Sequence, residues 1–439
     1  MNLWKFLKER MAGYGGKTAL VCGGESLAYA ELIGLAERGE HISDKCTVAV
    51  EDNPDRLQNA VGLLRALAGG RAAVPLNPEY GAAYCERIRA EIFAKRDMPP
   101  DPDIALIMFT SGSSGKPKGV MLSHENVISN ISAIGKYFQI KAGDSILIAR
   151  PLSHAAVLTG EFFVSLYKGL TVHLYNESFS PRRLASYMAE HKITVFCATP
   201  TLLNLLCRSI REGGKLPLKH MAVSGERLPK ETAIAIAGAF PDTDIYSVYG
   251  LTEASPRVSC LPPDKFRSKP GSVGVPIDGV QMRILDNGGE KAANGAQGRL
   301  WVKSAGVMRG YLGRPELTES KIKDGWLDTG DIAYKDEDGY FHIVGRADNM
   351  IIRSGMNIYP EEVEGALLSD GRIEKALCYA EPDALTGRRV CVKVVGNATV
   401  REVAETARKT LPAFMRPSRI EVVADLERTA SGKTARKRV

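Results

Sequence analysis

Short apolar runs alternate along much of the chain with segments that have the spacing of amphipathic helices. Residues 47–50 and 72–78 have the apolar character of strands, and residues 56–67 carry apolar side chains along one face of a helix. The same alternation returns at residues 183–223. Strands that alternate with helices are typical of a mostly parallel sheet with crossover helices, so an α/β fold is predicted here.

The pattern changes between residues 271 and 340. Short apolar segments are separated there by turn sequences, among them Asp286-Asn-Gly-Gly289 and Asp336-Glu-Asp-Gly339. Such turns join neighbouring antiparallel strands, which predicts a distorted, barrel-like subdomain. After residue 358 a mixture of helix and strand patterns runs to the end, which predicts a small α+β domain.

The chain has 439 residues, of which 44% are hydrophobic and 25% charged. That length exceeds one ordinary core, and the composition is typical of a soluble globular protein with two or three domains. No run approaches the roughly 20 apolar residues that span a bilayer, and residues 1–10 resemble an amphipathic helix more than a secretory signal. The eight cysteines contain no CxxC pair, which argues against metal or disulfide use. We therefore expect a cytoplasmic protein without a membrane span.

The net charge of +7, from 58 basic and 51 acidic residues, is modest for this length. Part of it lies in Arg436-Lys-Arg438, where we expect a solvated terminus. No motif for reading bases occurs, so nucleic acid is not an expected partner.

A stretch rich in glycine, hydroxyl groups and lysine follows the apolar run of residues 104–109. It reads Thr110-Ser-Gly-Ser-Ser-Gly-Lys-Pro-Lys-Gly-Val120, and a helix is predicted to begin soon afterwards with Ser123 as its N-cap. Such residues between a strand and a helix let several backbone N–H groups point at one anion, and Lys116 and Lys118 add positive charge. The spacing is not that of a Walker loop. These features favour a phosphate site over a flexible linker.

A second stretch, Asp244-Ile-Tyr-Ser-Val-Tyr-Gly-Leu-Thr-Glu-Ala254, ends an apolar strand with a ring, a glycine, a hydroxyl and a carboxylate. An aromatic ring can stack on a base, and glycine lets a ligand approach the backbone. A carboxylate can hold Mg²⁺ through oxygen. The sequence therefore indicates a second part of a nucleotide site.

These stretches, together with Trp326-Leu-Asp-Thr-Gly-Asp331 and Leu426-Glu-Arg-Thr-Ala-Ser-Gly-Lys433, resemble the motifs of the adenylate-forming enzymes. That superfamily contains acyl- and aryl-CoA synthetases, adenylation domains and luciferases, and the chain is most similar to the acyl-CoA synthetases. The resemblance covers about residues 25–439, in the family's order. It implies a large domain of stacked αβαβα sheets plus a distorted β-barrel over residues 1–347. A small, mobile α+β domain over residues 348–439 would follow.

The resemblance also implies an ATP site. Residues expected to grip the β- and γ-phosphates are Thr110, Ser111, Gly112, Ser113, Ser114, Gly115, Lys116 and Lys118. Residues expected around the adenine are Ser224, Gly225, Glu226, Arg227, Tyr249, Gly250 and Leu251, with Tyr249 stacked on the base. Asp331 would accept hydrogen bonds from both ribose hydroxyls, and Arg346 would bind ribose or phosphate.

Catalytic roles follow from the same resemblance. Thr252 would bind phosphate, and Glu253 and Thr110 would hold Mg²⁺. Lys433 matches the catalytic lysine that neutralises charge on the α-phosphate. His154 follows a Pro-Leu-Ser step and would gate the carboxylate site.

Two further positions concern a second half-reaction. Asp348 falls at the family's pivot between the two domains, and Gly355 falls in the loop that lines the route of the thiol. Only residues 79–103 separate the predicted strand at residues 72–78 from the phosphate loop. The family has a longer stretch there, so this part is predicted to be trimmed.

The acid substrate is constrained by one position. Ala156 stands where amino-acid-activating domains carry an aspartate, and a methyl group cannot balance a buried ammonium. That argues against an ordinary α-amino acid. The pocket is expected from residues 154–163, 223–225 and 249–256, which are mostly small or apolar and suit an aryl or medium acyl acid.

The implied activity is that of an ATP-dependent carboxylic acid–thiol ligase, which forms acyl-AMP and pyrophosphate and then a thioester on a phosphopantetheine thiol, that of CoA in the first place. Loading of an acyl, aryl or unusual amino acid onto a carrier protein is an alternative. A luciferase-like oxygenation and a non-catalytic nucleotide-binding homologue are two others. The sequence predicts no oligomeric state.

Overall fold

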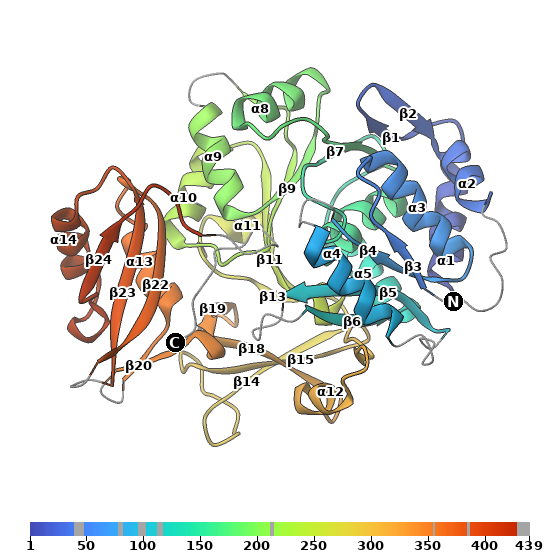
Figure 1. The fold of residues 1–439 in the computed structure, drawn as a ribbon. Helices are drawn as coiled ribbons and strands as arrows, with labels where there is room; N and C mark the ends of the chain where they lie inside the picture. The colour runs from blue at the N-terminus through green and yellow to red at the C-terminus, as the bar shows by residue number, and fades with distance from the viewer. Residues whose placement is uncertain are drawn as a thin grey trace.

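The computed structural model describes residues 1–38, 48–77, 82–94, 102–111, 117–210, 215–353, 356–383 and 387–427. Its strands form five sheets within those ranges. Figure 1 shows a large body formed by the first three sheets and a smaller C-terminal body beside it. The predicted α/β fold with a large N-terminal part and a small C-terminal part is confirmed.

The largest sheet has nine strands, and its central strands pair in parallel. In spatial order they are β13 (Val275–Pro276), β12 (Arg257–Leu261), β11 (Asp244–Gly250), β10 (His220–Val223), β9 (Val195–Ala198), β7 (Ser145–Ile148), β8 (Thr171–Leu174), β1 (Thr18–Cys22) and β2 (Glu25–Ala28). Antiparallel pairs occur only toward the two edges of this sheet. The parallel centre follows from the alternation of strands and helices seen in the sequence.

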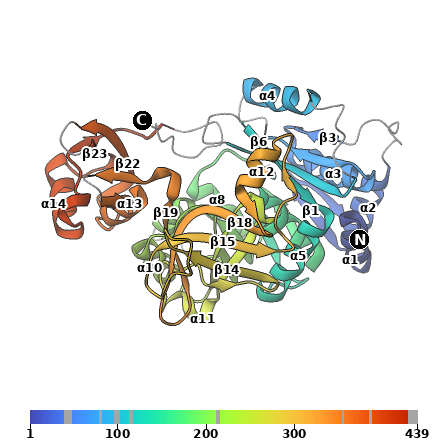
Figure 2. The same cartoon turned by 90° about the horizontal axis from the view of Figure 1, so that it is seen from below.

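The second sheet has five strands. In spatial order they are β16 (Gly310–Tyr311), β6 (Pro117–Ser123), β5 (Ile104–Ser111), β4 (Ala72–Pro75) and β3 (Val48–Glu51). Helix α3 (Arg56–Ala68) connects β3 to β4, and α4 (Ala82–Phe93) is the helix between β4 and β5. Figure 2 shows α4 on the outside of the molecule, beyond β3 and β6.

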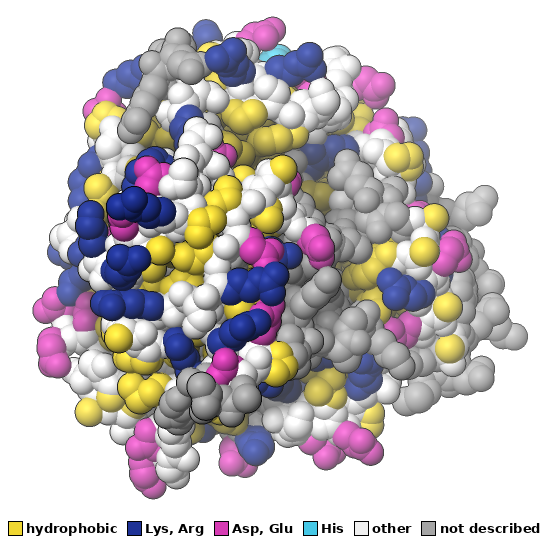
Figure 3. Space-filling model, turned by 60° about the vertical axis from the view of Figure 1, so that its left-hand side comes forward, with side chains coloured by type: hydrophobic (Ala, Val, Ile, Leu, Met, Phe, Trp, Pro, Cys, Tyr) yellow, Lys and Arg dark blue, Asp and Glu magenta, His cyan; other side chains and the backbone are white. Residues whose placement is uncertain are grey.

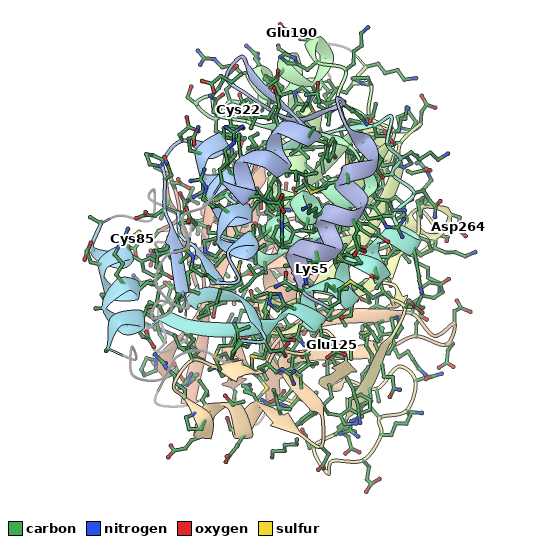
Figure 4. The ribbon with its side chains drawn as sticks, turned by 90° about the vertical axis from the view of Figure 1, so that its right-hand side faces the viewer. Lys5, Cys22, Cys85, Glu125, Glu190 and Asp264 are labelled. Carbon is green, nitrogen blue, oxygen red and sulfur yellow. The ribbon has the colours of Figure 1, made fainter. Side chains whose placement is uncertain are left out.

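Helices and the two sheets form five layers. On one outer face α8 (Pro181–Glu190), α9 (Pro200–Ile210) and α10 (Lys230–Ala239) share a hydrophobic cluster with the nine-stranded sheet. A second cluster joins both sheets through α1 (Leu3–Met11), α2 (Tyr29–Glu37), α3 and α5 (His124–Tyr137). A third packs α4 on the five-stranded sheet. In Figure 4, Glu190, Lys5 and Cys85 mark α8, α1 and α4. The αβαβα prediction is therefore confirmed.

The phosphate loop lies between two strands, which corrects the expected strand-to-helix turn. β5 and β6 pair in antiparallel fashion, with Thr110 opposite Lys118 and Ser111 opposite Pro117. The segment after the loop is a strand because Val120 and Leu122 alternate into the core. Helix α5 begins only after β6, and there Ser123 is its N-cap, as predicted.

The third sheet is antiparallel, as the turn sequences predicted. Its strands are β14 (Val280–Leu285), β15 (Gly298–Ser304), β17 (Ile322–Lys323), β18 (Trp326–Lys335) and β19 (Phe341–Arg346). Helix α12 (Pro315–Lys321) lies beside it. In Figure 1 this sheet lies below the nine-stranded sheet, and its last strand leads toward the small domain.

The C-terminal part has its own core. Its elements are β20 (Ile351–Arg353), β21 (Met356–Ile358), α13 (Pro360–Leu367), β22 (Ile373–Asp383), β23 (Gly387–Gly396), α14 (Val400–Thr410) and β24 (Arg419–Val422). The predicted boundary at residue 347 falls in the short turn η5 (Ala347–Asn349). Arg227 contacts both parts, donating to the carbonyl of Ile343 at 3.2 Å and to that of Glu361 at 2.8 Å.

Lysine and arginine side chains are spread over the surface among aspartates and glutamates, as Figure 3 shows for one face. In the small domain several of them form ion pairs, such as Arg389 with Glu381 at 2.6 Å and Arg372 with Asp370 at 2.8 Å. The positive net charge therefore does not mark a single basic face there. In the part of the chain that the structure describes, no helix combines the length and the apolar character that crossing a membrane requires.

Candidate active site

Tyr249, Asp331 and Arg346 meet where the nine-stranded sheet adjoins the antiparallel sheet. The Tyr249 hydroxyl donates to Oδ2 of Asp331 at 2.5 Å, and Nη1 of Arg346 donates to Oδ1 at 3.0 Å. Nη1 of Arg346 also donates to the carbonyl of Thr329 at 2.8 Å. Asp331 is only 7% exposed. A carboxylate, an aromatic ring and a guanidinium are thus held together, as the sequence motifs predicted for one site.

Strand register and one glycine position this cluster. Asp331 on β18 lies directly opposite Arg346 on β19, so the two side chains share one face of the sheet. Gly330 has a φ of +73°, and a Cβ there would lie 2.8 Å from Nη2 of Arg346. A side chain at this position would therefore displace the guanidinium as well as strain the backbone. The Asp-Thr-Gly-Asp sequence thus has a structural reason for its glycine.

Burial and neighbouring charges both shift the pKa values of this cluster. Burial raises the pKa of Asp331, while Arg346 and the Tyr249 hydroxyl oppose that rise. Burial and the neighbouring Asp331 carboxylate raise the pKa of Tyr249 well above its usual value. The Tyr249 hydroxyl therefore remains protonated and donates to the carboxylate.

Lys118, Glu253 and Tyr311 form a second cluster. The Tyr311 hydroxyl donates to Oε1 of Glu253 at 2.9 Å, and Nζ of Lys118 lies 5.4 Å from the centroid of the Tyr311 ring. Burial, together with the Glu253 carboxylate, raises the pKa of Tyr311, so its hydroxyl stays a donor. Burial lowers the pKa of Lys118, and Glu253 opposes that shift. A carboxylate and an ammonium thus lie close together at the base of the phosphate loop.

The strand pairings explain this second cluster. Lys118 lies opposite Thr110 across β5 and β6, and Tyr311 on β16 pairs with Val120 of β6. Glu253 lies in the short turn η4 (Thr252–Ala254), which follows β11. Its carbonyl accepts from the backbone N–H of Met308 at 2.9 Å, which ties η4 to the segment before β16. Glu253 and Tyr311, which lie about 140 and 190 positions beyond the loop in the sequence, are therefore brought close to it.

The turn after β10 carries the four residues predicted beside the adenine. Ser224 is buried, and Gly225 has a φ of +92°. The side chain of Glu226 accepts from the hydroxyl of Thr201 at 2.7 Å, and that of Arg227 binds carbonyl groups at the small domain. The side chains of Glu226 and Arg227 are therefore engaged by other residues of the protein.

The remaining predicted residues differ in how much the structure says of them. Gly250 and Leu251 lie in a tight turn, where a Cβ on Gly250 would come within 1.9 Å of the Pro256 carbonyl oxygen. Asp348 lies in η5, and its charge acts on both Lys118 and Arg346. Several predicted site residues lie outside the described residues. They are Gly112, Ser113, Ser114, Gly115 and Lys116 of the phosphate loop, Gly355 of the thiol route and Lys433 of the catalytic-lysine motif. The side chain of Ser111 also lies outside them.

His154 lies between a strand and a short helix. β7 ends at Ile148, and His154 is the residue before α6 (Ala155–Val157). A π-helix, η3 (Leu158–Phe163), continues α6. Single π-helical turns often occur at functional sites because they redirect side chains. This segment is the one expected to line the acid pocket.

Buried charges lie beside the segment that is expected to line this pocket. Nη2 of Arg150 forms an ion pair with Oε1 of Glu161 at 2.5 Å and donates to the Ser224 hydroxyl at 3.3 Å. Glu161 is 1% exposed and Arg257, on β12, is 3% exposed. Burial raises the pKa of Glu161, and Arg150 and Arg257 oppose that rise. Neither Arg150 nor Arg257 was predicted, because a sequence pattern does not distinguish a buried arginine from an exposed one.

Two family models match the chain. The model described as AMP-binding enzyme matches residues 86–312, and the model described as AMP-binding enzyme C-terminal domain matches residues 362–433. The first range includes the β5–β6 loop, β11 and Tyr311, and the second includes Lys433. The two matches therefore cover both parts of the fold.

Relatives of known name match most of the chain. A feruloyl-CoA synthase from an Amycolatopsis species is 31% identical, over 99% of this chain and 97% of the relative. A long-chain-fatty-acid–CoA ligase from Bacillus subtilis is 33% identical, over 82% of this chain and 65% of the relative. The alignment with the first runs over 485 positions, more than the 439 residues of this chain, so that relative has residues without a counterpart here.

Solved structures show the same fold. MatB from Rhodopseudomonas palustris with bound ATP has a TM-score of 0.86 and 25% identity, over 99% of this chain and 97% of that one. The o-succinylbenzoate CoA synthetase from Bacillus subtilis, solved with an acyl-adenylate, has a TM-score of 0.86 and 24% identity, over 98% and 96%. The likeness extends over both the large and the small part of the chain.

Proposed function

The chain belongs to the AMP-binding enzyme family and is an acid–thiol ligase, and we propose that it activates a carboxylic acid as acyl-AMP and passes the acyl group to the thiol of CoA. One observation carries the proposal: Asp331 is held between the Tyr249 hydroxyl and the Arg346 guanidinium. A nucleoside presents an aromatic base and two ribose hydroxyls. This cluster offers an aromatic ring and a fixed carboxylate to match them.

ATP would bind along the line from Tyr249 to Lys118. The ring of Tyr249 stacks on the adenine. Ser224 and Gly225, which follow β10, border the adenine as well. Asp331 accepts from the ribose hydroxyls, and Arg346 holds Asp331 in place while presenting charge to the phosphates. Lys118 and the loop before it grip the β- and γ-phosphates. This order of groups follows the order of the parts of ATP.

Glu253 and Thr110 would hold Mg²⁺ in this scheme. Carboxylate and hydroxyl oxygens are the ligands that this ion prefers, and Glu253 lies in the cluster with Lys118, which in turn is the cross-strand partner of Thr110. The bound ion would neutralise negative charge on the phosphates. Tyr311 fixes the Glu253 carboxylate through its hydroxyl group, which keeps one carboxylate oxygen oriented.

The first half-reaction joins two anions. A carboxylate oxygen of the acid forms a bond to the α-phosphorus as the bond to pyrophosphate breaks. Neutralised charge and fixed geometry supply most of the acceleration in such a step. Thr252 and Lys433 are the residues that we assign to the α-phosphate, and His154 borders the incoming carboxylate.

The second half-reaction makes the thioester. The thiol sulfur attacks the acyl carbonyl carbon, and AMP leaves with the electrons of the broken bond. We assign the hinge for a domain movement to Asp348, between residues 1–347 and 348–439, and the thiol route to the loop at Gly355. The movement would withdraw Lys433 once acyl-AMP has formed.

CoA is the acceptor that we favour. The relatives at 31–33% identity are named CoA synthases or CoA ligases, including enzymes for feruloyl and long-chain fatty acyl groups. The acid is not an ordinary α-amino acid, because Ala156 on α6 offers no charge to an ammonium group.

Exchange of labelled pyrophosphate into ATP, run with a panel of carboxylic acids, tests the first half-reaction. We expect exchange that depends on one class of acid. Thioester formation with CoA and with a phosphopantetheinylated carrier protein, compared side by side, tests the acceptor. No exchange with any acid would leave a nucleotide-binding protein without ligase activity, and transfer to the carrier alone would replace CoA as the acceptor.

A further inference from the structure

Arg257 lies inside the protein, beside the segment that is expected to line the acid pocket. It is on β12, directly after the turn that carries Glu253, and it is 3% exposed. Its guanidinium lies against the π-helix η3: a Cβ on Gly160 would be 3.0 Å from Nη2 of Arg257. Because position 160 is a glycine, the guanidinium fills space that a side chain would otherwise take.

Gly160 places this guanidinium against the segment expected to line the acid pocket. It lies four residues after Ala156, about one helical turn along the same segment, so both positions face the same side. Ala156 and Gly160 both belong to residues 154–163, which are expected to line the acid pocket. Nη1 of Arg150 lies 3.2 Å from where a Cβ of Gly225 would be, and Gly225 is a second position expected to line the pocket.

The charges in this region do not balance. Arg150 forms an ion pair with Glu161, which is itself buried. Among the residues that the structure describes, Arg257 forms no ion pair, and a hydrogen bond links it to the Tyr137 hydroxyl. Arg150, Arg257 and Arg56 all act on the Glu161 carboxylate, so more than one guanidinium shares it. A buried guanidinium without a carboxylate partner is unfavourable unless a ligand completes it.

Unsatisfied polar atoms gather at the same place. Within the described ranges, buried side-chain atoms without a hydrogen-bond partner include Nε of Arg257, Nε of Arg150 and Oε2 of Glu161. The hydroxyl oxygens of Ser153 and Thr159, on the same segment as Glu161, are also without a partner. Most buried polar groups are satisfied in folded proteins, so such a concentration indicates a place where another molecule supplies partners.

We propose that the acid carries a second anionic group, such as a carboxylate, at the end of its acyl chain away from the reacting carboxylate, and that Arg257 binds it with Arg150. This inference rests on the proposed function, since it names the substrate class of the same site. A carboxylate would accept from the unpaired Nε–H groups and would balance the second guanidinium. A hydrocarbon end would leave Arg257 unpaired, and an ammonium end would be repelled.

Matched acids test the inference in the pyrophosphate exchange assay. The probes are α,ω-dicarboxylic acids, ω-hydroxy acids and unsubstituted monocarboxylic acids of equal chain length from four to ten carbons, with terephthalate, 4-hydroxybenzoate and benzoate as the aromatic set. We expect kcat/KM for the best dicarboxylic acid to exceed that for its monocarboxylic counterpart by about 100-fold. The ω-hydroxy acids should fall between the two.

The variant Arg257→Met keeps the length of the side chain and removes its charge. We expect it to reverse the preference, with kcat/KM falling for the dicarboxylic acid and rising for the monocarboxylic acid. Arg257→Lys, which keeps a cation, should retain the preference for the dicarboxylic acid. Arg401→Met, the same change at an exposed position on α14, is the matched control and should leave both values unchanged. The melting temperature and AMP affinity of each variant report folding separately.

The outcomes are distinguishable. Preference of the unaltered protein for monocarboxylic or ω-hydroxy acids, in an assay that shows exchange, overturns the anionic end group and leaves the ligase activity standing. The same conclusion follows if Arg257→Met folds and keeps the original preference. Exchange with no acid at all overturns the proposed function, and the inference falls with it.

Discussion

Oδ1 of Asp331 and Nη1 of Arg346 lie 3.0 Å apart across the pairing of β18 and β19, where the two residues are direct cross-strand partners. Directly opposed residues of an antiparallel pair share one face, so the backbone alone places the guanidinium beside the carboxylate. Arg346 therefore fixes the orientation of the carboxylate that we assign to the ribose.

Asp331→Asn should weaken ATP binding. An amide offers one acceptor oxygen where the carboxylate offers two, and it loses the charge-assisted bond with Arg346. We expect KM for ATP in the pyrophosphate exchange assay to rise by roughly 30-fold, which corresponds to about 2 kcal/mol. Asp278→Asn, at an exposed residue that pairs with Lys136, is the matched control and should have no effect. An unchanged KM for Asp331→Asn would contradict the assignment of the ribose to this residue.

The pH dependence of ATP binding should report Asp331. Burial raises its pKa, and Arg346 opposes that rise. The ionised form accepts from the ribose, so kcat/KM for ATP should fall on the acid side as Asp331 becomes protonated. Arg346→Met removes the cation that lowers this pKa, and the acid limb should therefore move to higher pH. A profile that only drops in height, with its limb unmoved, would show that Arg346 does not act through Asp331.

Much of the nucleotide site could be predicted because its residues stand in short local motifs. Tyr249 and Asp331 each lie within a distinctive sequence motif. The structure brings them within hydrogen-bonding distance although 82 positions separate them. The five layers followed from the alternation of strand and helix patterns. Each of these features depends on residues that are close together in the chain, so it could be predicted from the sequence.

Other features depend on pairings that no local pattern shows. β6 was not predicted, because its apolar alternation is short and begins at a proline next to the glycine-rich loop. Tyr311 reaches Glu253 only because β16 pairs with β6. Arg257 directly follows residues 249–256, which we predicted to line the pocket, yet whether such an arginine is buried depends on the neighbouring helix and its Gly160.

Tyr311→Phe should weaken the binding of Mg²⁺. The hydroxyl group that donates to Oε1 of Glu253 is lost, while the ring beside Lys118 remains. Groups that orient a metal-binding carboxylate typically contribute about 10- to 100-fold in metal affinity. We expect the Mg²⁺ concentration for half-maximal exchange to rise by roughly 10-fold. Tyr379→Phe on β22 removes a hydroxyl in the small domain and is the control. A Mg²⁺ dependence equal to that of the unaltered protein would argue against Glu253 as the metal ligand.

Ser123→Ala should destabilise the large domain. The Ser123 hydroxyl accepts from the N–H of Asn126 at 3.1 Å, and the Asn126 side chain accepts from the N–H of Ser123 at 2.8 Å. Loss of such an N-cap costs about 1 kcal/mol. We expect the free energy of unfolding, measured in urea, to fall by that amount. Ser320→Ala removes an exposed hydroxyl that donates to the carbonyl of Leu317 and should have a much smaller effect. An equal fall in the free energy of unfolding for both variants would mean that the N-cap at Ser123 does not stabilise helix α5.

Lys433→Ala separates the two half-reactions. We assign Lys433 to the charge on the α-phosphate, which develops only while acyl-AMP is being formed. The variant should therefore lose pyrophosphate exchange by several orders of magnitude, because electrostatic groups of this kind are worth about 10²- to 10³-fold or more each. It should still convert chemically prepared acyl-AMP and CoA into thioester and AMP, measured by chromatography, at a rate close to that of the unaltered protein. Lys409→Ala, at the end of α14, controls for the loss of a small-domain lysine. If both half-reactions fall equally in Lys433→Ala, the lysine serves both steps, and the withdrawal of Lys433 about a hinge at Asp348 is not part of the mechanism.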